Sequence, residues 1–127
     1  MKPVILLLIA ALMVAACANA ELPSANDTAI RAALSSGRPT VADFGARTCI
    51  PCKKMAPILE ELSRELKGKA NVTFTDVWAT PALAQDYRVQ MIPTQIFFDA
   101  KGKEVKRHMG FMDKANLLKE LKALGMK

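Results

Sequence analysis

The sequence predicts an α/β domain in which a central mixed sheet is flanked by helices on both faces. Strand-like apolar runs alternate with amphipathic, helix-like segments over residues 28–124. This alternation requires right-handed crossovers, which place helices on both faces of a sheet. About a hundred residues follow an amino-terminal targeting segment, and they are enough for one compact domain at residues 21–127.

The first half of the domain is predicted to contain two helices and two strands. Residues 28–34 have a short helical pattern, and the apolar run at 40–44 is typical of a buried strand in a mostly parallel sheet. Apolar residues then recur with helical spacing over 52–67, and Gly68 ends this helix. These apolar residues are Met55, Ile58, Leu59, Leu62 and Leu66. Residues 71–78 form the second strand-like run.

The second half is predicted to contain a short helix at 81–87, strands at 94–98 and 104–109, and a final helix. Turn residues at 100–103 separate the two strands, so we expect them to form a hairpin. Asp113 can cap the final helix. The apolar stripe of that helix consists of Leu117, Leu118, Leu121 and Leu124. Trp78, Phe97 and Phe98 lie in strand-like runs, where we expect them in the core.

The first twenty residues predict an exported protein. Lys2 precedes an apolar run at residues 4–18, and Ala18-Asn19-Ala20 offers a small-x-small cleavage site before Glu21. A retained membrane anchor is one alternative. Its apolar run of fifteen residues, at about 1.5 Å each, is shorter than a hydrocarbon core of roughly 30 Å. We therefore expect a cleaved signal peptide at residues 1–20 and a periplasmic protein.

A lipoprotein signal is the second alternative for the amino-terminal segment. Val14-Ala15-Ala16-Cys17 resembles the lipobox of bacterial lipoproteins, in which the cysteine becomes the lipidated first residue. In that case the signal ends before Cys17, and a lipid anchors the protein to a membrane. Both processing routes remove or block Cys17, so the mature domain carries one dithiol, Cys49 and Cys52.

The positive charge of the chain does not indicate a nucleic-acid-binding protein. The formal net charge is +6 at pH 7. The lysines are spread over predicted helix faces and turns, whereas a nucleic-acid site gathers them with aromatic residues into one stripe. Solubility and weak attraction to acidic partners account for this charge.

The segment Cys49-Ile50-Pro51-Cys52 places two thiols three positions apart where a strand passes into a helix. Cys49 lies at the amino end of that helix, where free N–H groups and the helix dipole favour the thiolate over the thiol. Cys52 lies one turn further in and is more shielded. Pro51 suits the first helical turn, since its fixed φ is helical and its missing N–H would have no partner there. We therefore expect Cys49 to be the nucleophile and Cys52 the resolving cysteine.

Half of a zinc site and a purely structural crosslink are two alternatives for the cysteine pair. Zinc needs four ligands, and the mature chain offers only His108 as a further soft ligand. A crosslink that closes so short a loop constrains the unfolded chain little. The pattern favours a redox-active disulfide, Cys49–Cys52, that works without a metal or another cofactor.

Three segments of the sequence resemble the thioredoxin superfamily in order and spacing. They are Val41-Ala42-Asp43-Phe44, Cys49-Ile50-Pro51-Cys52-Lys53 and Met91-Ile92-Pro93-Thr94. The similarity extends from about residue 40 to residue 124, which is most of the mature chain. The resemblance implies a thioredoxin-like fold and a thiol–disulfide oxidoreductase.

The resemblance also implies roles for residues outside the dithiol. Pro93 would be the cis-proline that faces the dithiol, and the backbone of Ile92 would pair with an extended substrate strand beside Ile50 and Pro51. An ordinary proline at the start of a strand is the alternative. Asp43 would be the buried carboxylate that helps to move the proton of Cys52. A lone acid in an apolar strand is independently expected to have a raised pKa, unless it faces solvent at a sheet edge.

The sequence departs from the usual thioredoxin pattern at three positions. Thr48 stands where a tryptophan usually precedes the first cysteine, and Gly45 stands where another aromatic residue is common. Phe74 stands where many thioredoxins have a lysine near the buried acid. We therefore expect an altered surface around the dithiol and a buried acid without a neighbouring ammonium group.

These observations predict an envelope reductant that reduces disulfides in exported proteins and receives electrons from a membrane thiol carrier. One alternative is a disulfide donor or isomerase, since the direction of exchange depends on the relative stability of the two redox forms. Another is a non-catalytic module that binds extended peptides in the groove at Pro93. In each case the expected partners are disulfide-containing exported proteins, not nucleic acids, and the expected state is a monomer.

Overall fold

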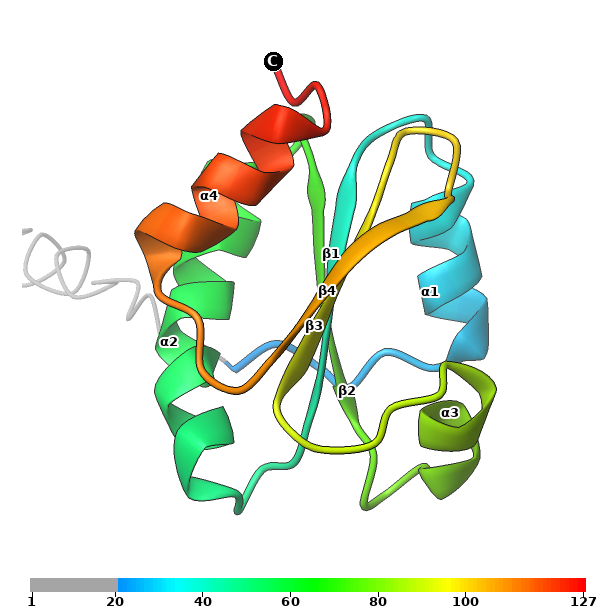
Figure 1. Cartoon of the computed structure of the whole chain (residues 1–127), viewed down its shortest axis with the longest axis vertical. Coiled ribbons are helices and arrows are strands. Elements are labelled where there is room, and N and C mark those ends of the chain that lie inside the picture. Colours follow the sequence, from blue (N-terminus) through cyan, green and yellow to red (C-terminus); the bar gives the residue numbers. More distant parts are fainter. Residues whose placement is uncertain (1–20) are drawn as a thin grey trace, which may run out of the picture.

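The computed structural model describes residues 21–127, so the predicted signal peptide and Cys17 lie outside the described residues. Eight elements follow one another along the chain (Figure 1). They are α1 (Asp27–Leu34), β1 (Thr40–Gly45), α2 (Ile50–Glu65), β2 (Asn71–Asp76), α3 (Pro81–Asp86), β3 (Thr94–Phe98), β4 (Glu104–Met109) and α4 (Lys114–Ala123). In the described part of the chain, no helix is both long enough and apolar enough to span a membrane.

The four strands form one mixed sheet in the order β2-β1-β3-β4. The β1–β2 pair is parallel, because α2 carries the chain back across the sheet between them. The β1–β3 and β3–β4 pairs are antiparallel, and a short turn joins β3 to β4 as a hairpin. The mixed sheet and the hairpin are as predicted, but the mostly parallel surroundings expected for β1 are wrong. An apolar run indicates burial on both faces, which a central strand has whatever the direction of its neighbours.

Helices cover both faces of the sheet, which confirms the predicted layers. Helices α2 and α4 lie on one side in Figure 1, and α1 and α3 lie on the other. Val41 and Phe97 are buried on the first side with leucines of α2 and α4. Ala42, Phe44 and Ile96 are buried on the second side, since successive residues of a strand point to opposite faces.

Strand β2 ends two residues earlier than predicted. The Oδ1 atom of Asp76 accepts hydrogen bonds from the backbone N–H groups of Trp78, at 3.0 Å, and Ala79, at 3.2 Å. This Asx turn leads the chain away from the sheet. As a result the side chain of Trp78 is 61% exposed, and the prediction that it belongs to the core is wrong. Phe97 and Phe98 are buried as expected.

The first described residues run beside the outer edge of β2. Ser24 forms a parallel bridge with Phe74, and the N–H of Ala25 donates to the carbonyl of Phe74 at 2.7 Å. The Ser24 hydroxyl accepts from the N–H of Asp76 at 2.9 Å. This segment therefore covers the carboxyl-terminal half of a strand edge that would otherwise be open to other chains.

Candidate active site

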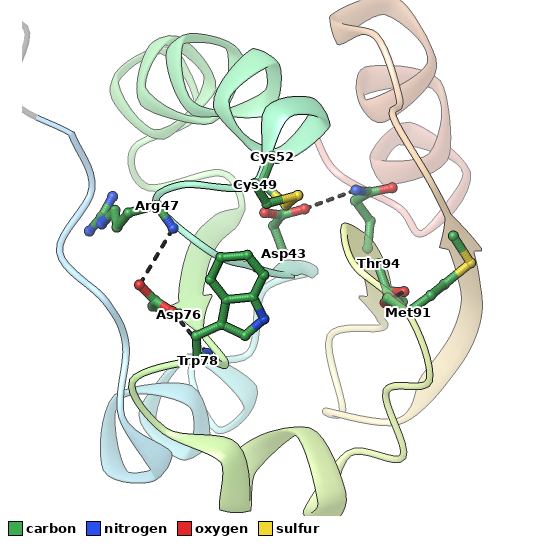
Figure 2. Close-up of a disulfide and its surroundings, with 9 residues drawn as sticks. Asp43, Arg47, Cys49, Cys52, Asp76, Trp78, Met91 and Thr94 are labelled. Carbon is green, nitrogen blue, oxygen red and sulfur yellow. Dashed lines mark hydrogen bonds between the residues drawn. A yellow bond between two sulfur atoms is a disulfide. The ribbon is translucent and has the colours of Figure 1, made fainter.

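The segments that carry the predicted site residues meet at one edge of the sheet. The carboxyl end of β1 leads to the cysteine loop, and the parallel strand β2 ends beside it. Strand β3 is antiparallel to β1, so its amino end, which follows Pro93, lies at the same edge. The topology thus brings together the cysteine loop, the turn at Trp78 and the loop that contains Pro93 (Figure 2).

Cys49 and Cys52 are joined by a disulfide at the start of α2. Cys49 is the N-cap residue, with an extended backbone, and its carbonyl accepts the first helical hydrogen bond from Lys53 at 2.9 Å. Pro51 lies in the first turn, as expected from its geometry. Cys49 is partly exposed, whereas Cys52 is only 3% exposed. Cys49 is therefore the more accessible residue of the pair and Cys52 the more shielded one.

Gly45 allows Cys52 to pack directly on β1. A Cβ atom at residue 45 would lie 3.2 Å from the Sγ of Cys52 and 3.3 Å from the Cε2 of Phe74. Any larger side chain would have to displace one of these two residues. Gly45, where an aromatic residue is common in the family, thus leaves the space that Cys52 occupies.

Asp43 lies on the face of β1 that α2 covers. Val41 and Gly45 alternate with it on this face; Val41 is part of the core beneath α2, and Gly45 adjoins Cys52. The side chain of Asp43 is 1% exposed. Its Oδ1 atom accepts a hydrogen bond from the Nε2 of Gln95 at 2.8 Å. Burial raises the pKa of Asp43 to about 7, and the hydrogen bond from Gln95 opposes this rise.

Gln95 is a site residue that no sequence motif indicated. It pairs directly with Asp43 across β1 and β3 and is fully buried. Phe74 pairs with Asp43 from the other side, so an aromatic ring lies beside the acid on β2. The signal in the sequence was one amide in the strand-like run at 94–98, beside three apolar residues. This signal could be linked to Asp43 only once the register was known.

Arg47 connects the cysteine loop to the segment beside β2. Its guanidinium group forms an ion pair with Glu21 at 3.3 Å and donates a hydrogen bond to the carbonyl of Leu22. It also lies over the ring of Phe74. Arg47, Leu22, Phe74 and Cys52 line one small, mostly apolar pocket beside the second cysteine. No sequence pattern indicated a role for Arg47, because its partners are distant in the sequence.

The loop before β3 carries the other predicted site residues. The Ile92–Pro93 peptide bond is cis, Pro93 is buried and Ile92 is half-buried. The Thr94 hydroxyl donates to the carbonyl of Met91 at 2.7 Å, and the N–H of Gly110 donates to the carbonyl of Pro93 at 2.7 Å. The first bond joins two residues of the loop, and the second ties the loop to the residue that follows β4.

Exposed apolar side chains come from each of the three segments that meet at this edge. They are Ile50 at the start of α2, Trp78 after β2 and Met91 before β3. Trp78 and Met91 are drawn with the disulfide in Figure 2. Within residues 21–127, no three His, Cys, Asp or Glu side chains gather in a way that could hold a metal ion.

Comparisons with known proteins agree with this geometry. A family model described as Thioredoxin matches residues 22–123. A thioredoxin from Mycolicibacterium smegmatis is 46% identical over 90 residues, which cover 69% of this chain and 80% of that protein. A bifunctional thioredoxin reductase/thioredoxin from Mycobacterium leprae is 43% identical over 88 residues, which cover 69% of this chain and 19% of that longer protein.

Solved structures show the same fold. A mutant thioredoxin from Halobacterium salinarum superposes with a TM-score of 0.72 at 29% identity, over 84% of this chain and 91% of that one. Chloroplastic thioredoxin z superposes with a TM-score of 0.71 at 26% identity, over 84% of this chain and 96% of that one. The fold and the Cys49–Cys52 pair define a thiol–disulfide oxidoreductase whose redox group is its own disulfide. The chain belongs to the thioredoxin family.

Proposed function

We propose that this protein reduces disulfides in exported proteins of the bacterial envelope. The observation that carries the redox part is the partly exposed Cys49 at the start of α2, bonded to a Cys52 that the helix shields. The targeting pattern of residues 1–20 supports the location outside the cytoplasm. A dithiol carrier in the membrane supplies the electrons that return the protein to its reduced form.

The reaction begins at Cys49 in the reduced protein. Its thiolate attacks one sulfur of the partner disulfide, the partner S–S bond breaks, and the second partner sulfur leaves as a thiolate that takes up a proton. A mixed disulfide now joins Cys49 to the partner. Free N–H groups at the start of α2 favour the attacking thiolate, since no side chain caps this end of the helix.

Cys52 completes the exchange. Its thiol gives a proton to the Asp43 carboxylate, and the resulting thiolate attacks the Sγ of Cys49. The partner leaves reduced, and two electrons have passed from the dithiol to the partner disulfide. A carboxyl whose pKa is about 7 suits this step, because it can accept and release a proton near neutral pH.

The substrate is held where the cysteine loop, the turn at Trp78 and the loop before β3 meet. An extended segment of the partner pairs with the backbone of Ile92 beside Pro93. Ile50 and Pro51 contact it from the cysteine loop, and both are exposed. The exposed side chains of Trp78 and Met91 provide apolar contact area around the reacting sulfur.

Single cysteine variants test the exchange. In an insulin-reduction assay we expect Cys49→Ser to abolish activity, while Cys52→Ser accumulates a mixed disulfide that reducing agent releases. Retention of insulin reduction by Cys49→Ser would exclude the mechanism. Equal partner binding by the double Cys49→Ser/Cys52→Ser variant, with no exchange by the native protein, would instead indicate a peptide-binding module.

The direction of exchange and the location need separate measurements. We expect the Cys49/Cys52 couple, equilibrated with glutathione or dithiothreitol buffers, to be more reducing than the partner disulfides; a strongly oxidising potential would indicate a disulfide donor. Mass spectrometry of the protein from a cell-envelope fraction should find an amino terminus at Glu21. A lipidated Cys17 would establish the lipoprotein route, and an intact residue 1 in the cytoplasmic fraction would contradict export.

A further inference from the structure

The Asp43–Gln95 pair contains two buried polar atoms that its single hydrogen bond leaves unused. Asp43 is 1% exposed and Gln95 is 0% exposed, and they lie directly opposite each other on β1 and β3. The Nε2 of Gln95 donates to the Oδ1 of Asp43 at 2.8 Å (dashed in Figure 2). Among the described residues, neither Asp43 Oδ2 nor Gln95 Oε1 has a hydrogen-bond partner.

The chemistry of a glutamine side chain suits both protonation states of a neighbouring carboxyl group. An ionised carboxylate only accepts hydrogen bonds, whereas a protonated carboxyl must also donate one. A half-turn of the Gln95 amide about its last side-chain bond exchanges Nε2 and Oε1 at nearly constant shape. The same residue can therefore donate to the carboxylate or accept from the acid. An apolar residue could do neither, and a lysine would support only the ionised form.

We propose that Gln95 is a positioning residue that follows the proton on Asp43: its amide donates to the carboxylate and rotates to accept from the acid. The proposal builds on the role of Asp43 as proton acceptor for Cys52. When the proton moves from the Cys52 thiol to Asp43, the rotated amide receives the new O–H. When Asp43 releases the proton, the amide turns back. Gln95 thereby keeps a buried proton acceptor hydrogen-bonded in both of its states.

Among the described residues around Asp43, Gln95 is the one that forms a hydrogen bond with it. On β1 the neighbours of Asp43 on the same face are Val41 and Gly45, and on β2 its partner is Phe74. In α2 the buried titratable residues are Cys52, which is in the disulfide, and Glu60, and neither is hydrogen-bonded to Asp43. From β4, His108 pairs in register with Gln95, and its Nε2 lies 3.1 Å from the carbonyl oxygen of Phe111. No charged side chain of residues 21–127 forms a hydrogen bond or ion pair with Asp43, so the amide is its polar partner.

An NMR titration of the oxidised native protein tests the proposal without any variant. In this form the cysteines do not titrate, so the carboxyl ¹³C signal of Asp43 reports that group alone. We expect the side-chain ¹⁵N and ¹H signals of Gln95 to move with the same midpoint, since the amide protons leave the carboxylate as the acid forms. Gln95 signals that stay constant while Asp43 titrates would overturn the proposal.

Substitutions of Gln95 provide a second test of the proposal. Gln95→Leu and Gln95→Met remove the donor, and Gln95→Met adapts more easily to the cavity. Each should raise the pKa of Asp43 by up to about one pH unit, because the hydrogen bond that the carboxylate loses is stronger than the one that the acid loses. The pH profile for Cys52 attack on the mixed disulfide should move upward with it. Thr40→Val, which changes another fully buried polar residue of β1, is the control and should leave both midpoints in place.

The outcomes separate this inference from the proposed function. If Gln95→Leu moves the Asp43 midpoint but the rate of Cys52 attack does not follow it, the coupling of Gln95 to Asp43 stands and the proton role of Asp43 fails. In an Asp43→Asn background, Gln95→Leu should no longer change the pH profile. Unchanged Asp43 titration in both Gln95 variants would remove Gln95 from the mechanism.

Discussion

The guanidinium group of Arg47 lies over the ring of Phe74, with 4.3 Å between its Cζ atom and the ring centroid. The same group contacts Glu21 and the carbonyl of Leu22, so one side chain joins the cysteine loop, β2 and the start of the described chain. Phe74 in turn packs beside Cys52 and opposite Asp43. Phe74 thus stands where many thioredoxins have a lysine. One face of its ring contacts the guanidinium group of Arg47.

Replacement of Arg47 by alanine should lower the free energy of unfolding by about 1–2 kcal/mol, the value of a partly desolvated cation–π contact and a hydrogen bond. It should also speed hydrogen exchange at the N–H of Ala25, which bonds to Phe74. Urea unfolding and exchange mass spectrometry measure the two effects. Glu21→Ala is the control and should cost little, because that ion pair is exposed. Equal losses for both variants would contradict the cation–π account.

Asp43 should make the oxidised protein less stable as the pH rises. The folded carboxyl keeps its proton up to about pH 7, whereas the unfolded one releases it near 3.8. The folded state thus binds more protons between these values, so the free energy of unfolding falls with increasing pH across this window, by at most about 4 kcal/mol. Asp43→Asn should remove this part of the slope. Denaturant unfolding at pH 4, 5.5 and 7 provides the comparison, and parallel curves for the two proteins would refute the prediction.

Removal of the Trp78 side chain should affect substrate use more than stability. The ring is exposed beside the site, so Trp78→Ala should raise KM several-fold for peptide disulfides with apolar flanking residues, a loss of about 1 kcal/mol of contact. The melting temperature should change little. Val105→Ala trims an apolar residue of β4 that is 56% exposed and serves as the matched control. An unchanged KM for Trp78→Ala would exclude the ring from the substrate surface.

Lys114 should stabilise the packing of α4 against α2 in a manner that depends on pH and salt. Its ammonium group lies 2.8 Å from carboxylate oxygens of both Glu61 and Glu65. This contact lowers the pKa of Glu61 below 4.5, so its stabilisation is present above that pH and is lost as the pH falls further. Lys114→Met should lower the melting temperature at pH 7 in dilute buffer.

The difference between Lys114→Met and the native protein should shrink in 1 M salt and at pH 3. Lys119→Met, which removes an exposed lysine of the same helix, is the control for the loss of charge alone. Equal melting shifts for the two variants would show that the Lys114 contacts contribute nothing specific.

Local patterns in the sequence were enough to predict the layers and the dithiol. Amphipathic spacing identified α2, and the two cysteines with Pro51 identified its first turn. Properties that depend on distant segments were not predictable. The direction of β3 beside β1 is not encoded in an apolar run, so the link between Asp43 and Gln95 was missed. Trp78 was misplaced because the Asx turn at Asp76, not the apolar pattern, ends β2.

The docking of Leu22 and Ser24 beside β2 has a practical consequence for handling the protein. A fusion partner or affinity tag attached before Glu21 would emerge next to Arg47 and the cysteine loop, where it would compete with large substrates. The carboxyl terminus leaves the molecule at the end opposite the start of α2 (Figure 1). Immobilisation through Lys127 would therefore present the reactive sulfur to solution, and surface-based binding assays should be built in that orientation.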